Sequence, residues 1–332
     1  MAEPASTEPA TAAPLLETTG LTRHFRIGGL RRRMLHAVDS VDLQIDEREI
    51  VALVGESGSG KSTVARLLAM LYKPTSGTIQ FRGSPIADLK ARSDVLSYRG
   101  QVPMVFQDPY SSLNPAHTIS YVMMRGLKLH QPALTRGERE AEAERALETV
   151  GLVPARQSLV KYPHEMSGGQ RQRVSFALAL SCRPKLVLAD EPVSMLDVSI
   201  RVGLLNLMAR LRDDEGVSVL FITHDIASAR YVSDRVVVMY AGHVVETGPT
   251  EEVLHSPVHP YTQLLLSAVP DPRAPIAISS ADAAEPPRVI DPEPGCLFRW
   301  RCPLAVTACS QVTPRLRPTS AGHEAACHVT AP

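Results

Sequence analysis

The chain has 332 residues, 44% of them hydrophobic, which is enough to bury one large core or two ordinary ones. Lys plus Arg and Asp plus Glu number 35 each, and this balance excludes a global field that would draw the chain to nucleic acid or anionic lipid. No run reaches the roughly 18 apolar residues of a membrane-spanning helix. The acidic, Pro- and Ala-rich residues 1–14 lack a secretory pattern, so we expect a disordered arm on a cytosolic protein.

Strand and helix signals alternate at the start of the chain. Short β runs are predicted over residues 15–25, 35–45 and 49–55. The third run ends in a Gly-rich turn, and a helix is predicted over residues 61–72, "KSTVARLLAMLY". Pro74 and Gly77 are expected to close that helix before the chain returns to a strand.

The middle of the chain reads as helical and then as buried strands. Residues 108–180 are predicted to be mainly helical. Two continuous apolar runs follow, "KLVLAD" and "SVLFITHD", and a further helix is predicted between them. Unbroken apolar runs are typical of parallel strands that are covered on both faces. A hairpin is predicted to turn at Ala241–Gly242, and residues 270–287 are predicted to form a Pro-rich linker.

The stretch "GESGSGKST" lies where a strand gives way to a helix, the context that a phosphate-binding loop requires. Its glycines let successive N–H groups converge on phosphate oxygens, and the helix N-terminus adds partial positive charge. Lys61 would reach the β- and γ-phosphates, and the Ser62 hydroxyl would bind Mg²⁺. The predicted nucleotide-binding residues here are Gly55, Glu56, Ser57, Gly58, Ser59, Gly60, Lys61, Ser62 and Thr63.

A pair of carboxylates, Asp190 and Glu191, ends the apolar run "LVLADEP". In open α/β sheets, ligands bind at the carboxyl ends of the strands. Asp190 suits a water-mediated hold on Mg²⁺, and Glu191 suits polarising the water that attacks the γ-phosphate. The pair therefore predicts ATP hydrolysis rather than nucleotide binding alone.

The segment "MSGGQRQRV" resembles the signature of ATP-binding-cassette (ABC) ATPases, with Met166 in place of the usual Leu. The resemblance implies an α/β P-loop NTPase with a RecA-like core, an antiparallel β subdomain and a helical subdomain. The cassette would span residues 15–255, with the helical subdomain at about 108–180. It also implies a head-to-tail dimer, in which each signature closes over the ATP of the partner.

Further motifs of that family occur in the expected order, and their roles are implied by the resemblance. Phe25 would stack on adenine, and Asp197, in "SMLD" with Met195 for the commoner Ala, would lie in the cross-dimer loop. Glu191, Gln107 and His224 would be catalytic, and Ser62, Gln107 and Asp190 would hold Mg²⁺. The nucleotide-contacting residues outside the phosphate loop would be Phe25, Ser167, Gly168, Gly169, Gln170, Asp190 and Asp197.

The segments "FQDPYSSLNP", "DVSIR" and "HPYTQLLLSAVP" resemble the ATPase subunits of oligopeptide/dipeptide-type importers. That resemblance implies a peripheral subunit on the cytoplasmic face of the membrane. Its partners would be a second homologous ATPase, expected as a heterodimer, two integral permeases and, indirectly, an extracytoplasmic solute-binding protein, with no nucleic acid. The alternatives are a nickel or other small-solute importer of the same group, and a soluble ABC ATPase without a transporter.

An irregular C-terminal extension is expected over residues 256–332, and it carries four of the five cysteines, Cys296, Cys302, Cys309 and Cys327, spaced C-x5-C-x6-C-x17-C. No paired C-x2-C knuckle of a zinc ribbon is present. The importer group includes members whose tail binds a 4Fe–4S cluster, and the resemblance implies one here. A Cys/His zinc site with His323 and His328, or four inert buried thiols, are the alternatives.

Overall fold

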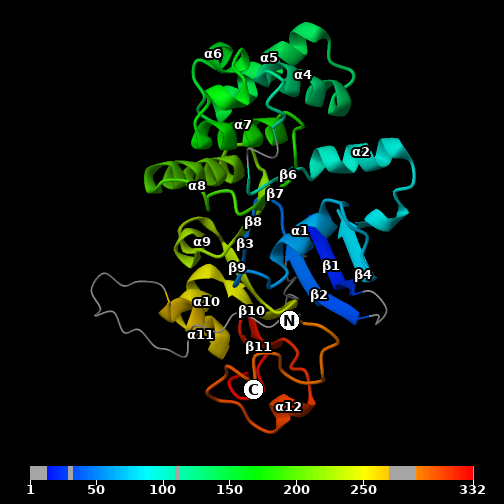
Figure 1. Ribbon diagram of the computed structural model, residues 1–332, viewed down its shortest axis with the longest axis vertical. Helices are drawn as coiled ribbons and strands as arrows, with labels where there is room; N and C mark the ends of the chain where they lie inside the picture. Colours follow the sequence, from blue (N-terminus) through cyan, green and yellow to red (C-terminus); the bar gives the residue numbers. More distant parts are fainter. Residues whose placement is uncertain (1–12, 29–32, 109–112, 269–288, 332) are drawn as a thin grey trace, which may run out of the picture.

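The computed structural model describes residues 13–28, 33–108, 113–268 and 289–331. Figure 1 shows a helical lobe at one end of the molecule, a sheet-containing centre, and the C-terminal extension at the other end. Residues 1–12 of the predicted arm and the whole predicted linker lie outside the described residues.

A mixed sheet runs through the centre, in the order β11-β12-β10-β9-β3-β8-β7-β6. β6, β7, β8, β3 and β9 run parallel to one another, and β10 turns back antiparallel to β9. The strands are β3 (Ile50–Val54), β6 (Met104–Val105), β7 (Leu186–Asp190), β8 (Ser218–Thr223), β9 (Arg235–Tyr240) and β10 (His243–Pro249). β3, β7 and β8 are buried along their whole length, which confirms the parallel strands expected from unbroken apolar runs.

A smaller antiparallel sheet packs beside the first, in the order β2-β1-β4-β5. Its strands are β1 (Leu16–Ile27), β2 (Arg33–Ile45), β4 (Ser76–Phe81) and β5 (Ser84–Pro85). Helix α1 (Lys61–Leu68) shares one apolar core with both sheets through Val64 and Leu68. The sequence predicts that this helix ends at Tyr72, but it ends four residues earlier, because Met70 adopts a left-handed conformation with φ 54°.

The predicted helical middle is confirmed as a lobe that Figure 1 shows beyond the strand ends. Thr118 caps α4, and Thr135 forms a capping box with Glu138 at α5, so side chains satisfy the free N–H groups of both helix starts. The helices of the lobe are α4 (Ile119–His130), α5 (Arg136–Thr149), α6 (Ala155–Leu159) and α7 (Gly168–Leu180), with the 3-10 turn η2 (Pro163–Glu165). The 3-10 turn η1 (Ile86–Asp88) and helix α2 (Arg92–Gln101) come before the predicted range and lie outside the lobe.

The central sheet is flanked by α8 (Val198–Asp213), α9 (Ile226–Val232) and α10 (Thr250–His255). The hairpin β9–β10 turns at Ala241 (φ 49°) and Gly242 (φ 88°), as predicted. In the described parts of the chain, no helix has the length and apolar character needed to span a bilayer.

The C-terminal extension is more ordered than expected. It holds α11 (Pro260–Ser267), α12 (Ala308–Gln311), β11 (Arg317–Ser320) and β12 (His323–Ala325). β12 pairs antiparallel with β10, where Glu246 is opposite Ala325, so the extension continues the central sheet. Strands of three and four residues are too short to leave a periodic pattern in the sequence.

Candidate nucleotide-hydrolysis site

The predicted phosphate loop follows β3 and leads into α1. Gly55 (φ 150°) and Gly60 (φ 106°) both occupy conformations that favour glycine. A Cβ at Gly55 would lie 2.2 Å from the carbonyl oxygen of Met239, and one at Gly60 would lie 2.3 Å from that of Ala37. Close backbone packing therefore requires glycine at both positions.

Lys61 is the first residue of α1 and is buried. Its Nζ donates hydrogen bonds to the carbonyl oxygens of Gly55 (2.7 Å) and Glu56 (2.8 Å) and to Ser59 Oγ (3.3 Å). Burial lowers the pKa of Lys61, while the charges of Glu191, Asp190 and Glu56 act in the opposite direction. The ammonium group is thus held inside the turn of the loop.

The Ser62 hydroxyl donates a 2.8 Å hydrogen bond to Asp190 Oδ1, which joins the phosphate loop to the end of β7. Burial raises the pKa of Asp190, and the hydrogen bond from Ser62 partly offsets this. A hydroxyl beside a carboxylate is a set of hard oxygen donors, the kind that Mg²⁺ prefers.

Two of the three predicted catalytic residues, Gln107 and His224, contact the carboxylate of the third, Glu191. Gln107 Nε2 donates a 3.0 Å hydrogen bond to Glu191 Oε2, and His224 Nδ1 lies 3.3 Å from the same oxygen. Glu191 itself has a left-handed backbone with φ 45°, an uncommon conformation for this residue type. Ser194, which sequence reasoning did not identify, donates a 3.0 Å hydrogen bond to the Glu191 carbonyl oxygen.

One feature of the fold accounts for this meeting. The phosphate loop, Gln107, Asp190–Glu191 and His224 each come at or just after the carboxyl end of a parallel strand: β3, β6, β7 and β8. The carboxyl ends of parallel strands share one edge of a sheet. Residues far apart in the sequence are therefore neighbours in space.

Phe25, the predicted adenine platform, is half-buried on β1. The Arg23 guanidinium lies 4.5 Å from the centre of its ring, and Tyr72 contacts it edge-on with ring centres 5.5 Å apart. Both neighbours hold the aromatic ring in place without covering it completely.

The predicted signature residues lie apart from this cluster. Ser167 caps α7 in a capping box with Gln170, and a Cβ at Gly169 would lie 2.6 Å from the Ile200 side chain. Asp197 is exposed before α8. Among the described residues, no hydrogen bond or ion pair joins Ser167–Gln170 to the phosphate loop.

Two residues of the C-terminal extension contact the phosphate loop, and sequence reasoning did not identify either of them. The Arg301 guanidinium donates two 2.8 Å hydrogen bonds to the Glu56 carboxylate, one to each oxygen. The Tyr261 hydroxyl accepts a 2.9 Å hydrogen bond from the Glu56 N–H. Phe298 packs edge-on against Tyr261 and Tyr240, which makes an aromatic floor beneath Arg301. The one feature of the sequence that could have drawn attention to Arg301 is its position next to Cys302 in "RWRCP".

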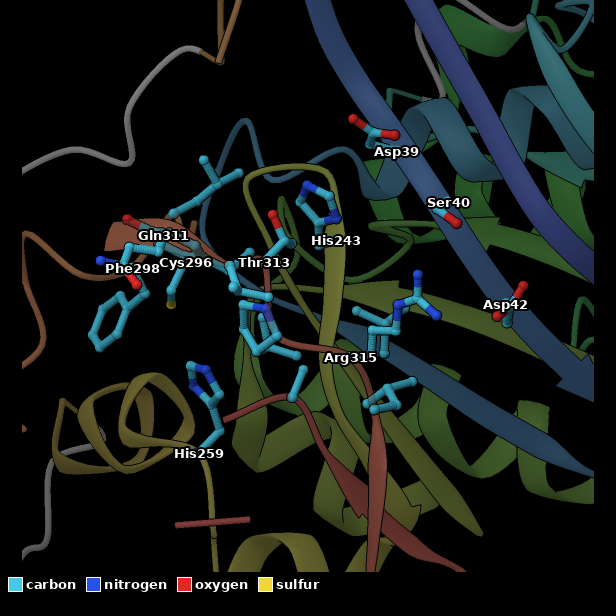
Figure 2. A pocket seen from close by; sticks show the side chains of 18 residues that line it. Asp39, Ser40, Asp42, His243, His259, Cys296, Phe298, Gln311, Thr313 and Arg315 are labelled. Carbon is cyan, nitrogen blue, oxygen red and sulfur yellow. The ribbon is translucent and has the colours of Figure 1, made fainter. Parts of the chain in front are cut away.

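The four tail cysteines gather in one part of the extension. The Cys296 N–H donates a 2.8 Å hydrogen bond to the Cys309 carbonyl oxygen, and the charges of Cys309, Cys302 and Cys327 all influence the pKa of Cys296. Burial raises the pKa of Cys296 and of Cys302. A cavity of about 890 Å³ lies between the extension and the hairpin β9–β10, and Cys296 is one of the residues that line it. Figure 2 shows Cys296 among these lining side chains.

Comparisons with known protein families match both the part of the chain that carries the phosphate loop and the C-terminal extension. Residues 38–194 match the family described as ABC transporter, and residues 245–309 match the oligopeptide/dipeptide transporter C-terminal region. The chain is 42% identical over 311 residues to the oligopeptide transport ATP-binding protein OppF of Salmonella typhimurium, covering 91% of this chain and 92% of that protein.

Solved structures agree with the fold. The dimeric ATP-binding cassette MJ0796, in a post-hydrolysis state bound to ADP and Pi, aligns with a TM-score of 0.63 and 29% identity, over 71% of this chain and 98% of that one. CbiO1 from Clostridium perfringens, part of the ABC transporter complex cbiONQ, aligns with a TM-score of 0.64 and 28% identity, over 74% and 92%.

Proposed function

The chain belongs to the family of ABC-transporter ATP-binding subunits, in the group that carries the oligopeptide/dipeptide transporter C-terminal region, and we propose that it hydrolyses ATP to energise the import of peptides. The observation that carries the hydrolytic part is the meeting of Gln107, Glu191 and His224 beside the Ser62–Asp190 pair. The peptide class rests on the C-terminal region and on the relative OppF.

In the proposed mechanism, Mg²⁺ would neutralise phosphate charge when bound. The fit of the site to this ion rests on the oxygen donors of Ser62 and Asp190, 2.8 Å apart, with Gln107 as a further ligand. Lys61 would turn from the loop carbonyl oxygens to the β- and γ-phosphates, which are stronger acceptors for an ammonium group.

Glu191 would accept the proton of the attacking water. Gln107 and His224 would orient the water and the Glu191 carboxylate, because both side chains already contact the same carboxylate oxygen. Phe25 would stack on the adenine ring. The signature residues Ser167–Gln170 and the loop residue Asp197 would act on the nucleotide of a second cassette, as the family resemblance implies. In support, no hydrogen bond or ion pair between described residues joins them to the phosphate loop of their own chain.

The assembly follows from that geometry and from the family. Two cassettes would pair beneath two integral permeases, at the cytoplasmic face of the membrane. We further propose that the second cassette is a homologous subunit, that an extracytoplasmic binding protein delivers the peptide, and that the cassette comprises residues 15–255 and the extension residues 256–332.

The replacement Glu191→Gln tests the hydrolytic assignment. Removing the base should lower ATP turnover of the assembled transporter by about 10²–10⁴-fold, and peptide uptake with it, while ATP binding persists. Glu47→Gln is the matched control, because that carboxylate is exposed and pairs with Arg82. Turnover that survives Glu191→Gln at the level of the control would refute the assignment.

The tail is proposed to hold a 4Fe–4S cluster on Cys296, Cys302, Cys309 and Cys327. Four thiolates around one zinc ion lie about 3.8 Å apart, given Zn–S distances near 2.3 Å. Among the described residues, no three of these sulfurs lie within 4.8 Å of one another. A 4Fe–4S cluster takes one thiolate at each of its four irons, so four cysteines in one segment supply the number of ligands that it needs.

Metal content tests the tail. Anaerobically purified protein should contain about four irons and four acid-labile sulfides per chain. Cys302→Ser should lose both, whereas Cys182→Ser, which changes the cysteine beyond α7, should keep them. Stoichiometric zinc without sulfide, or no metal in folded protein, would show that the cluster assignment is wrong.

A further inference from the structure

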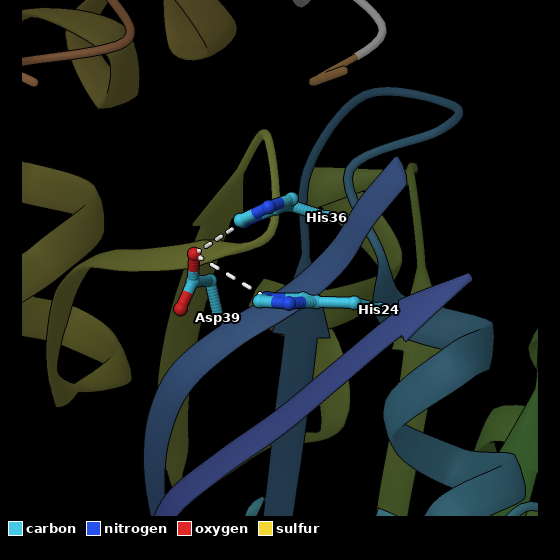
Figure 3. A group of neighbouring side chains, drawn as sticks. All are labelled: His24, His36 and Asp39. Carbon is cyan, nitrogen blue, oxygen red and sulfur yellow. Dashed lines mark hydrogen bonds and ion pairs between the residues drawn. The ribbon is translucent and has the colours of Figure 1, made fainter. Parts of the chain in front are cut away.

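A second cluster of metal-binding side chains lies outside the hydrolysis site. His24 on β1 and His36 and Asp39 on β2 turn toward one another, as Figure 3 shows. His36 Nδ1 lies 2.9 Å from Asp39 Oδ2, and His24 Nε2 lies 3.6 Å from the same oxygen. In the parts of the chain that the structure describes, these are the one group of three such ligand atoms within 4.8 Å of one another.

A β-bulge brings the three residues together. Arg23 pairs with Val38 and His24 pairs with His36, so Ala37 is an extra residue on β2. A bulge changes the direction in which the following side chains point, and here His36 and Asp39 both turn toward His24. The Asp39 N–H also donates a 2.9 Å hydrogen bond to the Gly242 carbonyl oxygen, which fixes the backbone of this carboxylate.

The cluster is incomplete as a hydrogen-bonded unit. His24 Nε2 is buried and has no hydrogen-bond partner among the described residues, and burial of a polar atom without such a partner is unfavourable. The two imidazole rings stack with centres 3.6 Å apart. Because a metal ion lies close to the plane of each imidazole that binds it, the two stacked rings would rotate apart when one ion binds between them.

We propose that His24 Nε2, His36 Nδ1 and the Asp39 carboxylate bind one divalent transition-metal ion of the zinc class. Around zinc, nitrogen and oxygen ligands at 2.0–2.1 Å lie about 3.4 Å from one another. The observed separations from Asp39 Oδ2, 2.9 and 3.6 Å, bracket that value. Imidazole nitrogens select zinc, copper, nickel or iron over Mg²⁺ and Ca²⁺.

The surroundings allow an ion to enter. Asp39 lines the cavity of about 890 Å³ that also borders the extension, and His243 lines it from the hairpin (Figure 2). The side chains of His24, His36 and Asp39 remain 19%, 20% and 28% exposed. Water from the cavity, or His243 after a side-chain rotation, would complete a four-coordinate site.

Zinc binding to the full-length protein, stripped of metal under reducing conditions, tests the proposal. Equilibrium dialysis with elemental analysis should find one zinc per chain that is lost, or bound at least about tenfold more weakly, in His36→Ala and in Asp39→Asn. His255→Ala is the matched control, since His255 makes a 2.9 Å contact with Glu251 within α10 and does not belong to the cluster. Cys302→Ser should leave this zinc in place, which separates it from any metal held by the tail.

Circular dichroism and thermal melting identify variants that fail to fold, and Asp39→Asn, which keeps the shape of the side chain, guards against that outcome. Cobalt binding gives a second readout: Co²⁺ at this site should show ligand-field bands without a thiolate charge-transfer band. Equal zinc content in wild type, folded His36→Ala and folded Asp39→Asn would overturn the proposal. Because nothing in it depends on ATP turnover, its failure would leave the proposed function intact.

Discussion

Glu56 shows how one residue of a common loop acquires a specific neighbour. The phosphate-loop pattern leaves this position open, yet both Glu56 oxygens accept hydrogen bonds from Arg301, across 245 residues of sequence. The Arg301 side chain is 11% exposed and that of Glu56 is 25% exposed, so water screens the pair only partly. Arg301 therefore neutralises a negative charge beside the place where ATP phosphates are proposed to bind.

Replacing Arg301 should weaken ATP binding. In Arg301→Ala the Glu56 carboxylate would be left unpaired and would repel the phosphates, so the ATP affinity should fall about tenfold. Arg301→Lys should recover part of the loss, because an ammonium restores the charge but not the two parallel hydrogen bonds. Calorimetric titration with a non-hydrolysable ATP analogue measures the effect.

Arg299→Ala is the control for that measurement, since Arg299 pairs with the exposed Glu293 and stacks on Trp300. An ATP affinity unchanged in folded Arg301→Ala would contradict the prediction. It would mean that the contact with Glu56 attaches the extension to the phosphate loop without affecting nucleotide binding.

At the scale of elements, α11 is fixed to the central sheet by two buried polar residues. The Glu246 carboxylate on β10 accepts hydrogen bonds from the N–H groups of Val258 (2.7 Å) and His259 (3.0 Å), and His323 Nε2 lies 2.8 Å away. His259 Nδ1 in turn accepts the N–H of Tyr261 at the start of α11. This arrangement places the Tyr261 hydroxyl against the phosphate loop.

The cap at His259 predicts a pH dependence of stability. Burial lowers the pKa of His259 from 6.5 to about 4. Between those values the unfolded chain binds more protons than the folded one, so the free energy of unfolding rises with pH. The contribution is fully present above about pH 6.5 and is lost as the pH falls toward 4, and it amounts to about 3 kcal/mol.

Urea unfolding of wild type and His259→Asn at several pH values measures this contribution. Asn keeps an acceptor for the Tyr261 N–H but does not titrate, so the difference between the two proteins should shrink between pH 7 and pH 4.5. A constant difference over that range would contradict the prediction.

At the scale of the whole molecule, the parts proposed to bind ATP lie in two places. The phosphate loop and its carboxylates lie at the strand ends, whereas Ser167–Gln170 open a helix of the lobe that Figure 1 shows beyond them. Between described residues, no hydrogen bond or ion pair joins the two sets. This separation is consistent with the proposed pairing of two cassettes, and the related cassette MJ0796 has been solved as a dimer bound to ADP and Pi.

Much of the fold and part of the site could be predicted because the signals are local. The loop "GESGSGKST" and the pair Asp190–Glu191 are each contiguous, and each follows an apolar strand whose burial pattern is visible in the sequence. Gln107 and His224 are different. A lone Gln or His after a strand has many roles, so only the family resemblance singled them out, and only the parallel strand order brought both to Glu191.

The sequence by itself determined the class of protein, because the segments that identify an ABC ATPase are short and continuous and carry their chemistry locally. The tertiary structure alone decided the pairing of Arg301 with Glu56, the joining of β12 to the central sheet, and the meeting of His24, His36 and Asp39. The physical reason is the same in each case. Such contacts depend on strand register, on a one-residue bulge, or on a chain that returns after more than 200 residues, and no periodicity or local spacing encodes those events.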